Sequence, residues 1–212
     1  MKNLLIVLLF VLAIPMARAG VWIEPYLGYM SGKATATVSV LGGAPTEYKY
    51  TYKTPMLGAR LGYGMMGLSA GLDYSLSTGS FEYKQDTPAT THGADKDKYT
   101  NLGIYVGYKF PLLFRVWGTY FLKSETKTDT VGAGTGSTVG DKVKGKGYAL
   151  GAGFTGLPLV AINLEYRAIT FDEVTDASTG TTTTLPISNA LFTESEIKAK
   201  EIMLSLSVPF DL

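Results

Sequence analysis

The segment NLGIYVGYKF, residues 101–110, alternates between two kinds of side chain. One set of alternate positions is bulky and apolar, and the other is small or polar. A period of two indicates a β-strand whose two faces lie in different surroundings. Ten residues is also about the length that a tilted strand needs to cross a bilayer. The bulky positions are Leu102, Ile104, Val106, Tyr108 and Phe110.

The same alternation recurs in about eight segments of the chain. Past residue 20, no apolar run approaches the length of a membrane helix. If lipid surrounds the protein, a closed barrel is then the one way to satisfy every backbone polar group. The bulky residues of the other segments include Leu27 and Tyr29, Leu57 and Leu61, Leu72 and Tyr74, Val116 and Tyr120, Leu150 and Phe154, Leu164 and Tyr166, and Leu204 and Leu206.

The links between these segments alternate between short and long. Residues 64–67, 111–113 and 156–159 read as tight turns, whereas the intervening links are long and polar. In outer-membrane barrels the short turns lie on the periplasmic side and the long loops lie outside. This asymmetry predicts outer loops at about 42–47, 84–98, 130–142 and 172–196.

The composition of the polar face indicates which side of the predicted barrel wall contacts lipid and which side faces the interior. A soluble barrel has apolar residues inside and polar residues outside. Here the polar face is rich in glycine and serine and carries few charges, which suits a narrow interior where opposite charges pair. We therefore predict an all-β fold, an eight-stranded antiparallel up-and-down transmembrane β-barrel. The predicted charge network of its lumen is Glu24, Arg60, Asp73, Arg115, Glu165 and Arg167.

The N-terminus has the features of a secretory signal. Lys2 precedes an apolar stretch from Leu4 to Ile14, and Ala17-Arg18-Ala19 forms a small-residue cleavage pattern. We expect residues 1–19 to be a signal peptide and residues 20–212 to be the barrel. The chain has no cysteine, so no disulfide stabilises it. Its near-zero net charge gives no indication of a nucleic-acid partner.

The side-chain pattern of the strands resembles that of the small eight-stranded outer-membrane proteins of the OmpA transmembrane-domain and OmpX type. Leu27-Gly28-Tyr29, Leu61-Gly62-Tyr63 and Val106-Gly107-Tyr108 carry this resemblance, together with the alternating C-terminal segment. The resemblance implies outer-membrane lipid, lipopolysaccharide and the barrel-assembly machinery as partners. It also implies that Phe210 and Leu212 form the C-terminal signal that the assembly machinery reads, although two residues follow Phe210.

Candidate catalytic and metal-binding residues carry weak signals. The one histidine, His92, lies in a predicted loop without a neighbouring nucleophile, so a solvated histidine is favoured over a catalytic one. Asp172, Glu173 and Asp176 lack the spacing of a calcium loop. The glycine-rich run 132–136 lacks the context of a phosphate loop. We predict no catalytic, cofactor-binding or metal-binding residues, and no enzyme activity.

Two further segments are predicted to lie outside the membrane. The run 179–184 is rich in threonine and is expected to be a mobile surface segment. Tyr48, Tyr50 and Tyr52 alternate with Lys49 and Lys53, and this set is expected near the outer boundary, as lipopolysaccharide contacts or as ordinary anchors.

The crowded lumen favours a barrel that presents extracellular loops, for adhesion, surface protection or envelope integrity, and that meets an extracellular partner through them. The alternative is a small channel of the OmpW type for ions or small apolar solutes, in which the glycine-rich lumen leaves a path.

Overall fold

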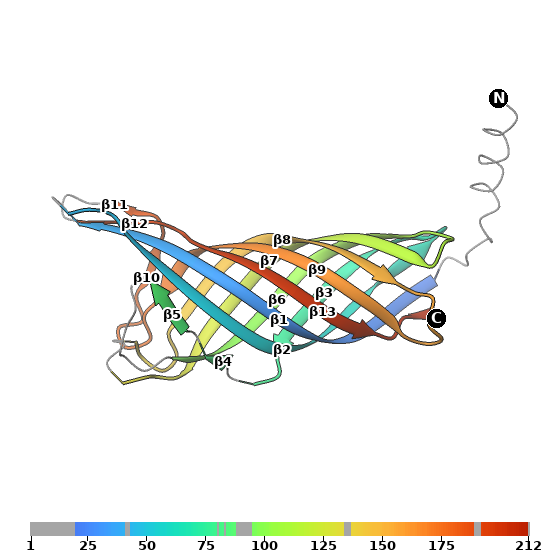
Figure 1. Cartoon of the computed structure of the whole chain (residues 1–212), viewed down its shortest axis with the longest axis horizontal. Coiled ribbons are helices and arrows are strands. Elements are labelled where there is room, and N and C mark those ends of the chain that lie inside the picture. Colours follow the sequence, from blue (N-terminus) through green and yellow to red (C-terminus); the bar gives the residue numbers. More distant parts are fainter. Residues whose placement is uncertain are drawn as a thin grey trace, which may run out of the picture.

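The computed structural model describes residues 20–40, 43–79, 81–82, 84–87, 95–133, 137–188 and 192–211. Eight long strands dominate this part of the chain (Figure 1). They are β1 (Gly20–Val40), β2 (Thr46–Met65), β3 (Leu68–Ser77), β6 (Lys96–Lys109), β7 (Phe114–Thr130), β8 (Lys142–Phe154), β9 (Ala161–Thr175) and β13 (Ile197–Ser207). The predicted signal peptide, residues 1–19, lies outside the described residues.

The long strands close into a ring. Each pairs antiparallel with the next, and β1 pairs with both β2 and β13, so the first and last long strands meet. A ring leaves no unpaired sheet edge in its wall. The prediction of an eight-stranded antiparallel up-and-down barrel is confirmed. In the described part of the chain, no helix has the length and apolar character needed to cross a membrane.

The barrel is apolar on its outside. Along β1 and β6, exposed and buried residues alternate, as the period of two in the sequence predicted. Leu27, Leu61 and Leu204 are more than half exposed, whereas Glu24, Arg60 and Arg167 have no exposed surface. Large apolar side chains thus cover the outside and charged ones fill the inside, the arrangement that a lipid surrounding requires.

The short links lie at one end of the barrel, which we call the short-turn end. Met66 and Gly67 join β2 to β3 with φ angles of 53° and 81°, the backbone that a two-residue hairpin requires. Leu113 and Leu159 also have positive φ in the other two short links. Exposed Tyr63, Phe110, Phe114 and Phe210 surround this end, as does the partly buried Phe154, as an interfacial aromatic girdle would.

The opposite, long-loop end is more ordered than the sequence suggested. β1 and β2 stay paired up to Val38 and Thr46. Short strands extend the wall there: β10 (Thr182–Thr184) pairs with β9, and β12 (Phe192–Glu194) pairs with β1 and with β11 (Ile187–Ser188). Figure 1 shows β11 and β12 beside the tip of β1, far from the C-terminus. The threonine-rich run expected to be mobile therefore contains a hydrogen-bonded strand.

Three more short strands complete the sheet. β4 (Phe81–Glu82) pairs with β6, and β5 (Lys84–Thr87) pairs with β2, so part of the second predicted loop is strand. β14 (Phe210–Asp211) pairs with the start of β1.

One residue of β7 faces the opposite way from the sequence-based assignment. The alternation places Lys123 on the interior face with Arg115, yet Lys123 is exposed and pairs with Glu125 at 3.0 Å. The strand register shifts between Phe121 and Ser124. A bulge inserts one extra residue and reverses the facing of the residues after it, which a strict period of two cannot reveal.

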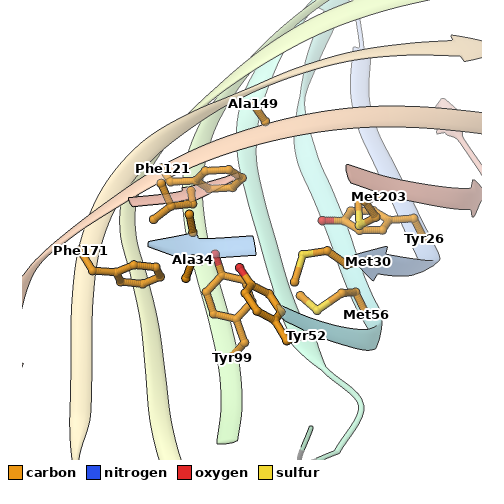
Figure 2. Packing of buried hydrophobic residues seen from close by; sticks show 12 residues of the cluster. Tyr26, Met30, Ala34, Tyr52, Met56, Tyr99, Phe121, Ala149, Phe171 and Met203 are labelled. Atoms are coloured by element: carbon orange, nitrogen blue, oxygen red, sulfur yellow. The ribbon is translucent and has the colours of Figure 1, made fainter. Parts of the chain in front are cut away.

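An apolar cluster fills the interior toward the long-loop end (Figure 2). Met30, Met56 and Met203 lie together, and Tyr52 and Tyr99 lie side by side with their hydroxyl groups pointing the same way. Phe121 and Phe171 close the cluster on the other side. The interior is therefore filled with large side chains as well as with charges.

Candidate functional site

The interior charges come from five strands. Glu24 lies on β1, Arg60 on β2, Asp73 on β3 and Arg115 on β7, while Glu165 and Arg167 share β9. All six side chains are buried, and each alternates with a residue that faces outward. The barrel therefore brings together residues up to 143 positions apart, from Glu24 to Arg167.

Arg60 is the centre of this network. Its Nε donates to Asp73 Oδ2 at 2.9 Å, and its Nη2 donates to Glu165 Oε2 at 2.8 Å. A third carboxylate, that of Glu24, lies 3.9 Å from Nη1. Two partners held by separate nitrogens fix the guanidinium plane, so Arg60 links three strands across the lumen.

Arg115 forms the second connection. Both of its terminal nitrogens donate to the Glu24 carboxylate, and Nη1 lies 2.7 Å from Oε2. Nη2 also donates to Asn163 Oδ1 at 2.7 Å and to Ser207 Oγ at 3.1 Å. The pair thus ties β1 to β7 and β9 at the level nearer the short turns.

Arg167 completes the set from β9. Its Nε donates to Glu165 Oε1 at 2.6 Å, so one carboxylate bridges Arg60 and Arg167. Three cations and three anions alternate through the network, and their formal charges cancel. Cancellation matters because an unpaired charge buried in a low-dielectric interior is costly.

Aromatic rings fill the space around the guanidinium groups. The Arg60 guanidinium carbon lies 4.4 Å from the ring centre of Trp117, 5.0 Å from that of Tyr26 and 5.2 Å from that of Tyr105. Trp22 stacks on Tyr105 with 5.3 Å between the ring centres. These contacts add cation–π attraction and exclude water from the ion pairs.

The small residues of the interior face make room for these rings. A Cβ atom on Gly151 would lie 2.2 Å from the Trp117 ring, and one on Gly58 would lie 2.2 Å from the Tyr26 ring. Each ring lies flat over the neighbouring strand where that strand has no side chain. The glycine-rich interior face suggested a narrow lumen or an open path. In the structure, aromatic side chains fill the space that these glycines leave.

Glu201 is an interior residue that the sequence reasoning missed. It is buried, accepts a hydrogen bond from Tyr52 Oη at 2.5 Å and lies 3.5 Å from Tyr99 Oη. The last strand was read from Ile202 onward, although Glu201 shares the parity of Met203 and Ser205. Tyr52 was expected at the outer boundary and instead lies in the lumen, because its position on β2 has the parity of Arg60.

The other residues considered from the sequence lie away from this network. His92, Gly134–Gly136 and Leu212 lie outside the described residues. Glu173 pairs with Lys144 at 2.8 Å, and Asp176 accepts hydrogen bonds from Ser178 and Thr179 in an exposed turn. The Ser178 hydroxyl is the main reason that the pKa of Asp176 is lowered. In the described part of the chain, no three acidic or histidine side chains converge as metal ligands would.

Phe210, near the C-terminus, has a defined place. It pairs with Ile23 on β1, and its ring is about half exposed at the short-turn end. Of the two residues predicted as an assembly signal, Phe210 therefore lies beside the start of β1, and the signal itself stays a prediction.

A cavity of about 420 Å³ opens at the short-turn end. Trp22, Tyr105 and Arg115 form its inner wall, and Lys109 and Pro209 lie at its rim. The other members of the charge network lie beyond this wall. The interior as a whole is filled by a charge-paired network and aromatic side chains, with a cavity at the short-turn end.

Solved structures of known proteins align with this chain over most of its length. The outer membrane protein AlkL in lipid bilayers is 14% identical, with 91% of each chain covered and a TM-score of 0.57. The outer membrane protein OprG from Pseudomonas aeruginosa is 13% identical, with 92% of this chain and 98% of that chain covered and a TM-score of 0.55. Ail, the attachment invasion locus protein of Yersinia pestis, is 13% identical over 91% of this chain and 100% of its own, with a TM-score of 0.47.

At these identities the likeness concerns the fold. No curated protein matches the sequence. The family profile of the outer membrane protein beta-barrel domain, in contrast, matches residues 4–210. With the inside-out wall described above, this match identifies both fold and location: the chain belongs to the outer membrane protein beta-barrel domain family and is a β-barrel of the bacterial outer membrane.

Proposed function

We propose that this barrel does not conduct or catalyse, and that it acts through its extracellular end, in adhesion, surface protection or envelope integrity. The observation that carries the proposal is the filled interior. Arg60 and Arg115 link strands across the lumen, Arg167 shares the Glu165 carboxylate with Arg60, and the cluster around Phe121 and Phe171 lies between this network and the long-loop end. A solute crossing the barrel would have to break several buried, hydrogen-bonded ion pairs, which is strongly unfavourable.

The extracellular end supports the second half of the proposal. The short turns define the periplasmic end, so the paired ends of β1 and β2 project outward, with β12 paired to β1, β11 paired to β12, and β10 paired to β9. These segments are hydrogen-bonded to the barrel wall and thus form a rigid support for the links between them. Functional residues of rigid scaffolds are commonly placed on such loops. We expect an extracellular partner or the neighbouring envelope to contact this end.

Planar-bilayer recording on refolded protein tests the sealed lumen. The native barrel should give no stable, sizeable single-channel steps. Removing a central cation together with two rings of the interior cluster, by Arg60→Ala with Phe121→Ala and Phe171→Ala, should produce steps, whereas Phe114→Ala on the outer face should not. Stable steps from the native protein, equal to those of the triple variant, would overturn the proposal.

A small channel is the second candidate, and the cavity of about 420 Å³ is the observation that favours it. An aromatic wall of Trp22 and Tyr105 beside Arg115 suits a small apolar or anionic solute that enters from the periplasm. If a path continues past this wall, neutralising Arg60 and Arg167 should change the conductance. An unchanged trace would count against the channel.

A further inference from the structure

Four lysines form a patch on the outer wall. Lys33 on β1, Lys53 on β2, and Lys198 and Lys200 on β13 are all exposed. The strands are neighbours, because β1 pairs with both β2 and β13. Lys33 stands directly opposite Lys200, and the register places Lys198 opposite Thr35 and Lys53 opposite Ser31. We call these four residues the lysine patch.

The patch is not neutralised by the protein. Among the described residues, no ion pair involves Lys33, Lys53, Lys198 or Lys200. Four lysines elsewhere on the barrel do have acidic partners: Lys49 pairs with Glu47, Lys98 with Asp129, Lys123 with Glu125 and Lys144 with Glu173. What distinguishes the patch from the remaining exposed lysines is that its four members gather on three adjacent strands. Like charges directly opposite one another on paired strands destabilise a sheet. The Lys33–Lys200 pair therefore calls for an anion that the chain itself does not provide.

The height of the patch indicates where that anion lies. The outward residues nearer the periplasm on the same strands are apolar: Tyr29 precedes Lys33 by four positions, Pro55 follows Lys53 by two, and Ile202 follows Lys200 by two. With a rise of about 3.3 Å per residue and a tilt of about 40°, the amines begin roughly 5 to 10 Å beyond the last apolar side chain. This is the headgroup layer of the extracellular leaflet.

We propose that the lysine patch binds the phosphorylated headgroup of an outer-leaflet glycolipid. Phosphate is the anion expected in this layer, and lysine binds it as a mobile point charge. Ser31, Thr35 and Thr51 lie between the amines on the same outward face and supply hydroxyl donors. The proposal does not rest on the barrel's being sealed, since it concerns the outer wall alone.

Two quadruple variants with the same change of charge test the patch. The patch variant replaces the four lysines of the patch with glutamine: Lys33→Gln, Lys53→Gln, Lys198→Gln and Lys200→Gln. The second, control variant removes four lysines that already have acidic partners: Lys49→Gln, Lys98→Gln, Lys123→Gln and Lys144→Gln. Folded protein in zwitterionic detergent is titrated with bisphosphorylated lipid A, and native mass spectrometry counts the bound lipid. The first variant should bind at least about tenfold more weakly than the native barrel, and the second should stay within about twofold.

Three other outcomes would overturn the proposal. Equal losses in both variants would mean that binding follows net charge. Undiminished binding of dephosphorylated lipid A would mean that the phosphates are not recognised and that the lysines are ordinary interfacial anchors. Displacement of lipid A by inorganic phosphate at comparable concentration would assign the patch to free phosphate.

A single variant provides a second readout. Without anionic lipid, Lys33→Gln relieves repulsion by Lys200, so this variant should unfold at the same or a higher urea concentration than the native protein. With lipid A present, the native protein should gain more stability than the variant. The native protein should then unfold at the higher urea concentration of the two. If the variant still unfolds at the same or a higher urea concentration than the native protein when lipid A is present, the proposal is contradicted, whatever the result of the titration.

Discussion

At the scale of single residues, Arg60 is the group on which the interior depends most. It is buried and donates to both Asp73 and Glu165. Replacing it with methionine leaves these carboxylates without their shared cation, which should lower the free energy of unfolding by about 3 to 5 kcal/mol. Urea unfolding in detergent micelles measures this. Lys98→Gln, which removes an exposed pair with Asp129, is the control and should cost less than about 1 kcal/mol.

Asp97 provides a pH-dependent test outside the membrane. It lies on β6 five residues beyond Leu102, where the apolar outer band ends, and exposed lysines flank it on the outer face. Burial is the main cause that raises the pKa of Asp97 from 3.8 to about 6, with contributions from neighbouring aspartates. A raised pKa means that the folded state binds the proton more tightly than the unfolded state. The contribution of Asp97 to stability is therefore greatest below about pH 4 and falls as the pH rises through 6.

Asp97→Asn should remove this penalty. At pH 7.5 the variant should be more stable than the native barrel by about 1 to 2 kcal/mol, and near pH 4 the difference should vanish. Urea unfolding at the two pH values checks this. A variant that is less stable at both values would show that the charged form of Asp97 is needed for the fold.

The residue scale also shows what a sequence can reveal about the interior. Glu24, Arg60 and Asp73 were identifiable because they share a strand face with small residues. In a membrane barrel this face is turned toward the lumen, since the bulky apolar face contacts lipid. The ion-pair partner of each charge could not be identified from the sequence, because it depends on the arrangement of strands that are far apart in the chain. Glu201 was missed for a more local reason: the last strand was read from Ile202 onward, whereas β13 begins at Ile197.

At the scale of paired strands, the interior glycines and aromatic rings form complementary units. Trp117 on β7 lies over Gly151 on β8, while the next pair along, Gly118 and Leu150, faces outward. Gly151→Ala should force the Trp117 ring away from Arg60 and cost about 1 to 3 kcal/mol. Gly118→Ala meets no atom closer than 3.7 Å and should be nearly neutral. Equal effects in urea unfolding would contradict this packing.

Strand positions were predictable from alternation, and the exceptions have physical causes. Strands whose own alternation is unbroken, such as β6 and β13, face as their sequence indicates. Lys123 does not, because the bulge in β7 shifts the register. The strands β10 and β12 were read as loop because their stability comes from pairing with β9 and β1 and not from an apolar face of their own.

At the scale of the whole molecule, the protein is a barrel with its apolar surface outside. The signs that led to this conclusion from sequence, namely period two, strand length and alternating link lengths, are global, and they were sufficient for the fold. The function was not equally predictable, because it depends on surfaces such as the extracellular end and the lysine patch whose partners leave no periodic pattern.

The most direct test of this account is tryptophan quenching by lipids with brominated acyl chains. The chain contains two tryptophans, Trp22 and Trp117, and both lie in the lumen. In refolded protein their fluorescence should resist the brominated lipid, whereas a Leu61→Trp variant should show an added component that is strongly quenched. Quenching of the native tryptophans with an unquenched Trp at position 61 would mean that the barrel's faces are reversed.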